Sequence, residues 1–180
     1  MIELALHILD IAENSSRADA TLIEITLVED MVNDILSLEI KDNGKGMDED
    51  TIEKAMDPFY TTKKVRRVGL GLPMLKQAAI TAGGRFSIES HVGKGTRVFA
   101  QFQHSHIDRQ PIGDIPGCLV ALIIGNPDID ILYTHTKNDR AYTLDTSEIR
   151  SALDGVPLNH REVLNVIKDN IIEGIAELNA

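Results

Sequence analysis

The chain has 180 residues, 43% hydrophobic and 26% charged, which is enough for one packed domain with a substantial appendage. A formal net charge of −10 argues against a general nucleic-acid-binding protein, because phosphate backbones reward clustered Lys and Arg. Cys118 is the only cysteine, which excludes an internal disulfide or a cysteine-based metal cluster and fits a reducing cytoplasm.

The N-terminal part of the chain predicts a helix, because apolar residues recur at helical spacing over residues 2–15 without Gly or Pro. It has no basic region of the kind that opens a secretion signal. No apolar run approaches the roughly 20 residues that a bilayer span requires. We therefore expect neither a secretion signal nor a membrane anchor.

Further helices and strands are predicted up to residue 103. Branched aliphatic residues predict two strands joined by a hairpin loop, and a turn at Asp42–Gly46 leads to a short acidic helix. A basic stretch without periodicity predicts a loop at 57–69, and a helix ending at Gly83–Gly84 precedes two more strands. The predicted strands are 22–28, 35–41, 85–91 and 96–103, and the predicted helices 47–56 and 70–82.

The composition changes at residues 108–117, where two prolines and two glycines predict a linker. Beyond it, apolar runs predict strands at 119–124 and 129–134, with a third near Tyr142 and two helical segments. We therefore expect residues 1–107 to form one domain and residues 118–180 an extension of unknown role. The fold class is α+β, a two-layer sandwich in which helices cover a mixed sheet.

Chemistry-bearing residues occur in a fixed order along residues 1–103. Asp10 and Asn14 are four residues apart, so both emerge on one face of the first helix. Asp42-Asn43-Gly44-Lys45-Gly46-Met47 follows, then Asp57-Pro58-Phe59-Tyr60-Thr61-Thr62-Lys63, Gly69-Leu70-Gly71-Leu72 and Gly93-Lys94-Gly95-Thr96. Taken singly, each is typical of a polar helix face, a hairpin turn or a solvated loop.

Together these segments resemble the GHKL ATPase superfamily, which includes gyrase, heat-shock chaperones, histidine kinases and the MutL mismatch-repair protein. The resemblance covers about 100 of the 180 residues and implies a Bergerat-type ATP-binding fold that binds ATP and Mg²⁺. Asn14 stands where the family places its Mg²⁺ ligand, and a neutral amide oxygen suits that hard cation. Asp10 stands where hydrolytic members usually carry Glu as the base, and the shorter side chain leaves direct base action open.

The resemblance also assigns the base-binding residues. Asp42 would accept a hydrogen bond from the adenine amino group, a buried polar contact that selects adenine over guanine. Gly44 and Gly46 would let the backbone approach the base and adopt positive φ angles, and Met47 completes this nucleotide-binding segment. Thr96 matches the position that reaches adenine through water.

The phosphates would lie at the segment Gly69, Leu70, Gly71 and Leu72, where backbone N–H groups and the helix dipole form a cradle. Residues 59–68 would form the lid over them, with Lys63 as the favoured phosphate contact. Arg17 follows Asn14 by three residues, where many kinases carry a basic residue near the phosphates. A solvated basic loop is the alternative interpretation of the lid.

Histidines could identify a complete kinase through a phosphoacceptor site. His7 lies on the apolar stripe of the first helix outside any such context, so we expect a packed or hydrogen-bonded residue. His104 and His106, two residues apart, are expected to be exposed loop residues, with a metal pair as the alternative.

These features predict a cytoplasmic, stand-alone regulatory protein of the histidine-kinase-like ATPase type. It would transfer phosphate to a protein partner on His or Ser, or hydrolyse ATP slowly. Two alternatives stay open, a non-catalytic ATP-gated protein-binding module and, less favoured, an ATPase clamp resembling MutL or gyrase. No nucleic-acid or membrane partner is expected. Residues 171, 172 and 175 can pack within the chain or across a homodimer.

Overall fold

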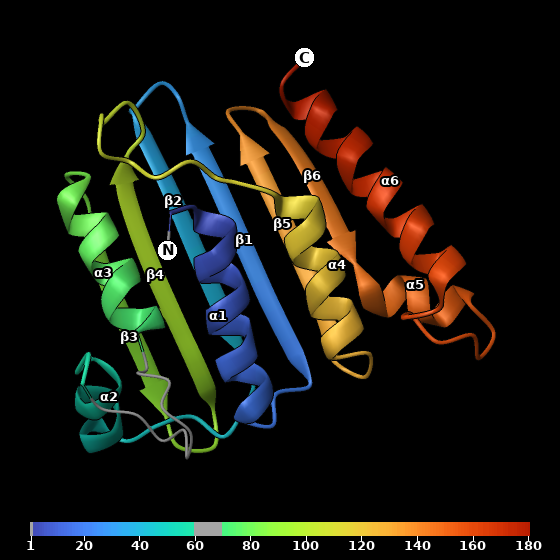
Figure 1. Cartoon of the computed structure of the whole chain (residues 1–180), viewed down its shortest axis with the longest axis horizontal. Coiled ribbons are helices and arrows are strands. Elements are labelled where there is room, and N and C mark those ends of the chain that lie inside the picture. The colour runs from blue at the N-terminus through green and yellow to red at the C-terminus, as the bar shows by residue number, and fades with distance from the viewer. Residues whose placement is uncertain (1, 60–69) are drawn as a thin grey trace.

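The computed structural model describes residues 2–59 and 70–180 of the chain. In this part of the chain six strands form one sheet in the order β3-β4-β2-β1-β5-β6, in which the β1–β5 pair is parallel and the other four pairs are antiparallel. The strands are β1 (Leu22–Asp30), β2 (Ile35–Asp42), β3 (Arg85–His91), β4 (Gly95–Gln103), β5 (Asp130–Lys137) and β6 (Arg140–Asp145). The expected mixed sheet is therefore confirmed (Figure 1).

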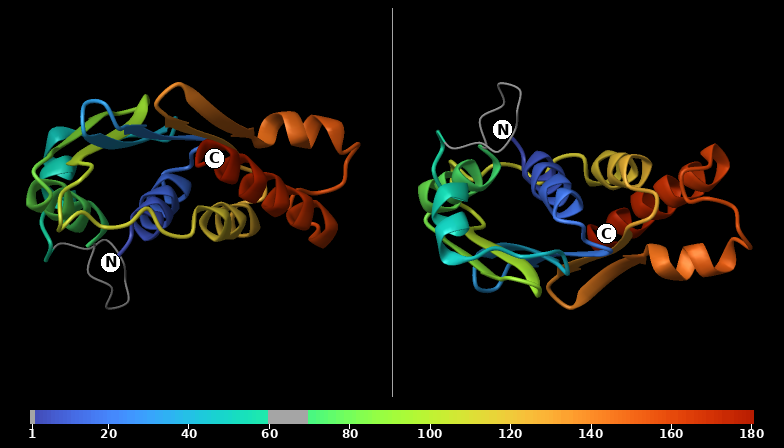
Figure 2. Two further views of the ribbon diagram at one scale, coloured as in Figure 1. Left: turned by 90° about the horizontal axis from the view of Figure 1, so that it is seen from above. Right: turned by 90° about the horizontal axis from the view of Figure 1, so that it is seen from below.

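The helices among the described residues are α1 (Leu4–Arg17), α2 (Glu49–Ala55), α3 (Gly71–Thr81), α4 (Ile115–Gly125), α5 (Thr146–Ala152) and α6 (Arg161–Leu178). Helices α1, α3, α4 and α6 lie on one face of the sheet, whereas α5 continues from the end of β6, as the two edge-on views show (Figure 2). Helix α1 packs on β1 and β2, α3 on β3 and β4, and α6 on β5 and β6. The chain thus forms the predicted two-layer α+β sandwich, and among the described helices none is long and apolar enough to cross a membrane.

Alternation along the strands decides which side chains form the core. In β1 every second residue is buried, and β2 follows the same pattern. These inward side chains meet the apolar face of α1, where Leu4, Ile8 and Ala12 are fully buried. The core is therefore a continuous apolar layer between helices and sheet.

The segment 119–124 corrects one prediction. It was expected to be a strand, whereas the structure places it inside helix α4. Asp114 caps this helix by accepting a hydrogen bond from the Gly117 N–H at 2.9 Å, and Pro116 occupies its first turn. Helix α4 packs between α1 and α6, so its apolar residues are not confined to one face. An uninterrupted apolar run of this kind does not distinguish a buried helix from a strand.

Residues 118–180 continue the same sheet. Strand β5 pairs in parallel with β1, with Leu22 opposite Asp130 and Glu29 opposite Lys137. Helix α4 begins within the predicted linker and lies against α1, where the Cys118 thiol contacts the Ala5 carbonyl oxygen at 3.2 Å. Burial raises the pKa of this thiol to about 12, so it is an unreactive core residue. The division into a domain and an extension stays a prediction.

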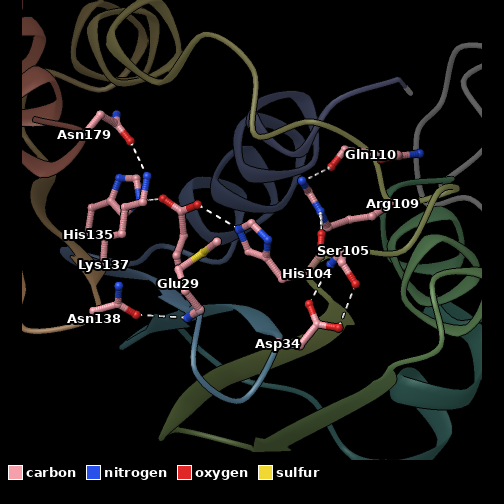
Figure 3. Close-up of polar contacts among 11 residues, drawn as sticks. Glu29, Asp34, His104, Ser105, Arg109, Gln110, His135, Lys137, Asn138 and Asn179 are labelled. Atoms are coloured by element: carbon pink, nitrogen blue, oxygen red, sulfur yellow. Dashed lines mark hydrogen bonds and ion pairs between the residues drawn. The ribbon is translucent and has the colours of Figure 1, made fainter.

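A polar cluster around the buried Glu29 lies at the C-terminal end of β1 (Figure 3). One carboxylate oxygen contacts His135 Nε2 at 2.9 Å, and the other contacts His104 Nε2 at 3.0 Å. The hydroxyl of Tyr133 contacts the second ring nitrogen of His135 at 3.1 Å. The expectation of an exposed His104 is therefore wrong, because the loop after β4 folds over the end of β1.

Candidate functional site

A cavity of about 530 Å³ opens where the C-terminal half of α1 faces the end of β2 and the start of β4. Helix α2 and the first turn of α3 complete its rim. The volume is typical of a site for a drug-sized or nucleotide-sized ligand. Nine of the residues singled out from the sequence line it, namely Asp10, Asn14, Arg17, Asp42, Gly46, Met47, Gly71, Leu72 and Thr96.

The floor of the cavity comes from β2 and β4. Asp42 is paired with Thr96 and Ile40 with Val98, so the four side chains share the helix-covered face of the sheet. The alternation of the two strands places them side by side. The floor therefore has an apolar part made by Ile40 and Val98 and a polar end made by Asp42 and Thr96.

Asp42 is 8% exposed, and its carboxylate is held from two sides. The Gly44 N–H donates to Oδ1 at 2.9 Å, and the Thr96 N–H reaches the same oxygen at 3.3 Å. The Ser15 hydroxyl, on α1, donates to Oδ2 at 2.6 Å. Every one of these partners is a donor, so the carboxylate can still accept a further donor from a ligand.

The turn after β2 requires glycine at two positions. A Cβ on Gly44 would lie 2.6 Å from the Ala18 carbonyl oxygen, and one on Gly46 would lie 2.0 Å from the His91 carbonyl oxygen. Gly46 also has a φ of +68°, which side-chain-bearing residues rarely adopt. The turn is thus packed between the end of α1 and the β3–β4 turn, which fixes the position of Asp42.

Asp10 forms the part of the cavity wall nearest to α3. A Cβ added to Gly71 would lie 1.7 Å from Asp10 Oδ2, so the carboxylate rests directly against the first residue of α3. Leu70 is the N-cap of this helix and supplies no side-chain acceptor. A half-buried carboxylate and the N-terminal turn of a helix therefore meet at one side of the cavity.

Asn14 lies one turn further along α1, on the exposed side of the cavity mouth. Its Oδ1 accepts a hydrogen bond from Arg17 Nη1 at 3.2 Å, while Arg17 Nη2 contacts Glu13 at 3.2 Å. Both partners in that ion pair are about half exposed, so the pairing is weak. The Asn14 amide oxygen therefore faces a cationic group that can readily move.

Two predicted residues in the described part of the chain, Gly44 and Leu70, do not line the cavity. The Gly44 N–H donates a hydrogen bond to Asp42, and Leu70 occupies the N-cap position of α3 without a side-chain hydrogen bond. Lys63 and Gly69 lie outside the described residues, as does most of the predicted lid. The roles given to all of these residues stay predictions.

Sequence reasoning missed several residues that the cavity exposes. Ser15 is 3% exposed and next to Asn14, and its position on the inner face of α1 was the available signal. Ile40 and Val98 are two residues from Asp42 and Thr96, so strand alternation would have placed them on the same face. Lys45 lies within the predicted segment 42–47, whereas Asp48, Thr51 and Val92 gave no such signal, because loop and helix packing brings them to the cavity.

Comparison with known proteins identifies the first part of the chain. A family model described as "Histidine kinase-, DNA gyrase B-, and HSP90-like ATPase" matches residues 2–106. Sensor kinase CckA of Brucella abortus (strain 2308) is 38% identical over 84 residues, which are 46% of this chain and 9% of that protein. Sporulation kinase E of Bacillus subtilis (strain 168) is 41% identical over 63 residues, 35% of this chain and 8% of that kinase. The chain therefore spans less than a tenth of either kinase.

A solved structure extends the likeness of the fold beyond the family match. The crystal structure of the N-terminal domain of a DNA repair protein superposes with a TM-score of 0.56 and 19% sequence identity. The superposition covers 81% of this chain and 53% of that one. At this identity the likeness concerns the fold alone, and it confirms the Bergerat-type architecture predicted from the sequence.

Proposed function

Because this chain belongs to the family of histidine kinase-, DNA gyrase B- and HSP90-like ATPases, we propose that its cavity binds ATP together with Mg²⁺ and serves phosphoryl transfer. The family match supports nucleotide binding for the domain. We further propose that the cation is Mg²⁺ and that the γ-phosphate passes to a protein partner or to water.

The observation that carries the proposal is the setting of Asp42. It is a buried carboxylate at the polar end of an otherwise apolar floor, and its known contacts are donors. An adenine ring would lie on Ile40 and Val98 and donate its amino hydrogen to Asp42. A guanine would present a carbonyl oxygen there and leave the carboxylate without its partner, which disfavours binding.

The residues at the cavity mouth fit a magnesium ion. Asn14 offers a neutral amide oxygen, a hard ligand of the kind that Mg²⁺ prefers, and that oxygen accepts a hydrogen bond from Arg17. Mg²⁺ takes few protein ligands and completes its shell with water and phosphate oxygens, so a single Asn is sufficient. Bound there, the ion would neutralise charge on the β- and γ-phosphates. Arg17 would then move from Asn14 to a phosphate oxygen.

Two further groups act on the phosphate end. Gly71 and Leu72 in the first turn of α3 line the cavity, and the N-terminal end of a helix favours negative charge. Asp10, packed against Gly71, is placed to orient the attacking hydroxyl of water or of a protein side chain and to hold its proton. We expect phosphoryl transfer to take place in the cytoplasm, where ATP and Mg²⁺ are available.

The test of phosphoryl transfer uses purified protein with γ-labelled ATP and Mg²⁺, with and without cell extract. We expect slow release of labelled phosphate or transfer of label to a protein acceptor. Loss of both products in Asp10→Asn, with ATP binding kept, would support the role of Asp10. Absence of any labelled product in the unaltered protein would refute the enzymatic part of the proposal.

A second candidate function is a nucleotide-gated binding module, which the long segment between α2 and α3 favours, because the helices on either side of it contribute Ala55 and Gly71 to the cavity. In this case ATP binding alone would control a protein partner. Asp10→Asn would then leave the biological activity intact, whereas Asn14→Ala would abolish it. Loss of activity in both variants would favour the enzyme.

Residues 118–180 are proposed to act as a structural extension of the ATPase fold. Strand β5 continues the hydrogen bonding of β1, and α4 supports α1, the helix that carries Asp10 and Asn14. Ile171 is fully buried, while Ile172 is 46% exposed. Sedimentation at micromolar concentration would show whether the exposed part of α6 also supports a homodimer.

A further inference from the structure

We propose that Ser15 is a positioning residue for Asp42, and that it sets the preference of the cavity for a 6-aminopurine. This inference rests on the proposed ATP binding. It concerns how the adenine acceptor is held, and the evidence is the set of contacts between α1 and the end of β2.

The Ser15 hydroxyl has two acceptors and one proton. Its oxygen lies 2.6 Å from Asp42 Oδ2 and 3.3 Å from the Ile11 carbonyl oxygen. The shorter distance falls in the range of a hydroxyl that donates to a carboxylate, whereas the longer one is a weak contact within the helix. The proton therefore goes to Asp42, and the bond joins the helix wall of the cavity to its floor.

The two oxygens of Asp42 are held in different ways. Oδ1 is held by the backbone N–H groups of Gly44 and Thr96, which no side-chain substitution removes. Oδ2 receives its protein donor from Ser15. A carboxylate fixed at Oδ1 alone can still tilt, so the Ser15 hydroxyl fixes the direction of Oδ2 and leaves that oxygen one acceptor position.

That direction matters for the ligand. With Oδ1 occupied twice and Oδ2 occupied once, Asp42 presents an acceptor to the cavity at one defined point. A ligand that donates a hydrogen there, such as the exocyclic amino group of adenine, is favoured. A purine with hydrogen at position 6 gains nothing from the same alignment. Both Ser15 and Asp42 are over nine-tenths buried, so water replaces the hydroxyl poorly.

A purely structural role for Ser15 predicts a different result. Buried Ser residues in helices commonly satisfy their hydroxyl on the carbonyl one turn earlier, and here that carbonyl belongs to Ile11. Replacing such a residue would disturb every nucleotide equally, because it would loosen the helix rather than the adenine acceptor. The two roles therefore separate when ligands with and without the amino group are compared.

The experiment measures the affinity of the full chain for Mg²⁺-ATP and for Mg²⁺-purine ribonucleoside triphosphate, which lacks the 6-amino group. For Ser15→Ala we expect the Kd of ATP to rise about fivefold to tenfold and that of the purine analogue to rise less than about twofold. Ser16→Ala is the matched control, because it removes a hydroxyl one residue away that donates to Asn126 instead. Its affinity for both nucleotides should change less than about twofold.

Ser15→Cys keeps nearly the same volume with a weaker donor, so it repeats the comparison if Ser15→Ala proves unstable. Equal losses for the two nucleotides, or no loss for either, would overturn the role of Ser15 and leave ATP binding intact. Failure of the unaltered protein to bind either nucleotide would overturn both the inference and the proposed function.

Discussion

The Glu29 cluster allows a quantitative prediction about stability. The hydrogen bond from His135 holds the pKa of Glu29 low, at about 2 rather than 4.5, against the opposing effect of burial, and His104 adds to the lowering. A pKa unit corresponds to about 1.4 kcal/mol, so the charged form of Glu29 contributes about 3 kcal/mol to folding at pH 7. The change to test is Glu29→Gln.

The direction of the pH effect follows from the lowered pKa. Between about pH 4.5 and pH 2 the unfolded chain binds a proton that the folded chain does not, so this contribution is complete above pH 4.5 and lost as the pH falls toward 2. Glu29→Gln should therefore cost about 3 kcal/mol at pH 7 and progressively less below pH 4.5. For a chain of this length that corresponds to a fall in Tm of about 10 °C.

Urea unfolding of both proteins at pH 7, 4.5 and 3 measures the difference. Glu173→Gln is the control, because Glu173 is exposed on α6 and its replacement should change the free energy of unfolding by less than about 0.5 kcal/mol. A cost for Glu29→Gln that is equally small, or that stays constant down to pH 3, would refute this account of the cluster.

Three further predictions concern other parts of the fold. Gly71→Ala should lower ATP turnover by about tenfold or more with little change in Tm, because the added Cβ displaces the Asp10 carboxylate. Unchanged turnover would show that the position of Asp10 against Gly71 does not matter for the reaction. Asp114→Ala should destabilise the protein by about 1 kcal/mol in urea unfolding, because it removes the cap of α4; an unchanged midpoint would contradict that role. Burial lowers the pKa of His7, against the effect of the hydrogen bond that its Nε2 donates to the Gln110 amide oxygen. The unfolded chain therefore takes up the proton first, and stability should fall as the pH drops below 6.5. The His7→Gln variant should lack this part of the loss, and identical pH profiles would show that His7 does not cause it.

Local patterns predicted most of the elements that build the cavity. Alternation in β2 and β4 and the helical spacing around Asp10 and Asn14 depend on neighbours in the sequence, which explains their agreement with the structure. Helix α4 was missed for the same reason, because its environment comes from α1 and α6 rather than from its own sequence. A helix buried on several sides lacks the periodicity on which the prediction relies.

The features that the sequence did not predict are contacts between elements far apart in the chain. The parallel pairing of β5 with β1 joins residues more than 100 positions apart, and nothing in either strand specifies that partner. The bond from Ser15 to Asp42 and those from the two histidines to Glu29 also cross between elements. Single-sequence patterns identify the residue types in such contacts without identifying which of them meet.

The central claim is that Asp42 and Asn14 bind the two ends of one nucleotide, and calorimetric titration of Mg²⁺-ATP tests it most directly. We expect the unaltered protein to bind ATP and Asp42→Asn to lose at least about tenfold in affinity, because an amide can turn a donor toward the adenine amino group. Asp50→Asn, an exposed carboxylate on α2 outside the cavity, should bind like the unaltered protein. No heat at millimolar ATP, or equal affinities for all three proteins, would contradict the account.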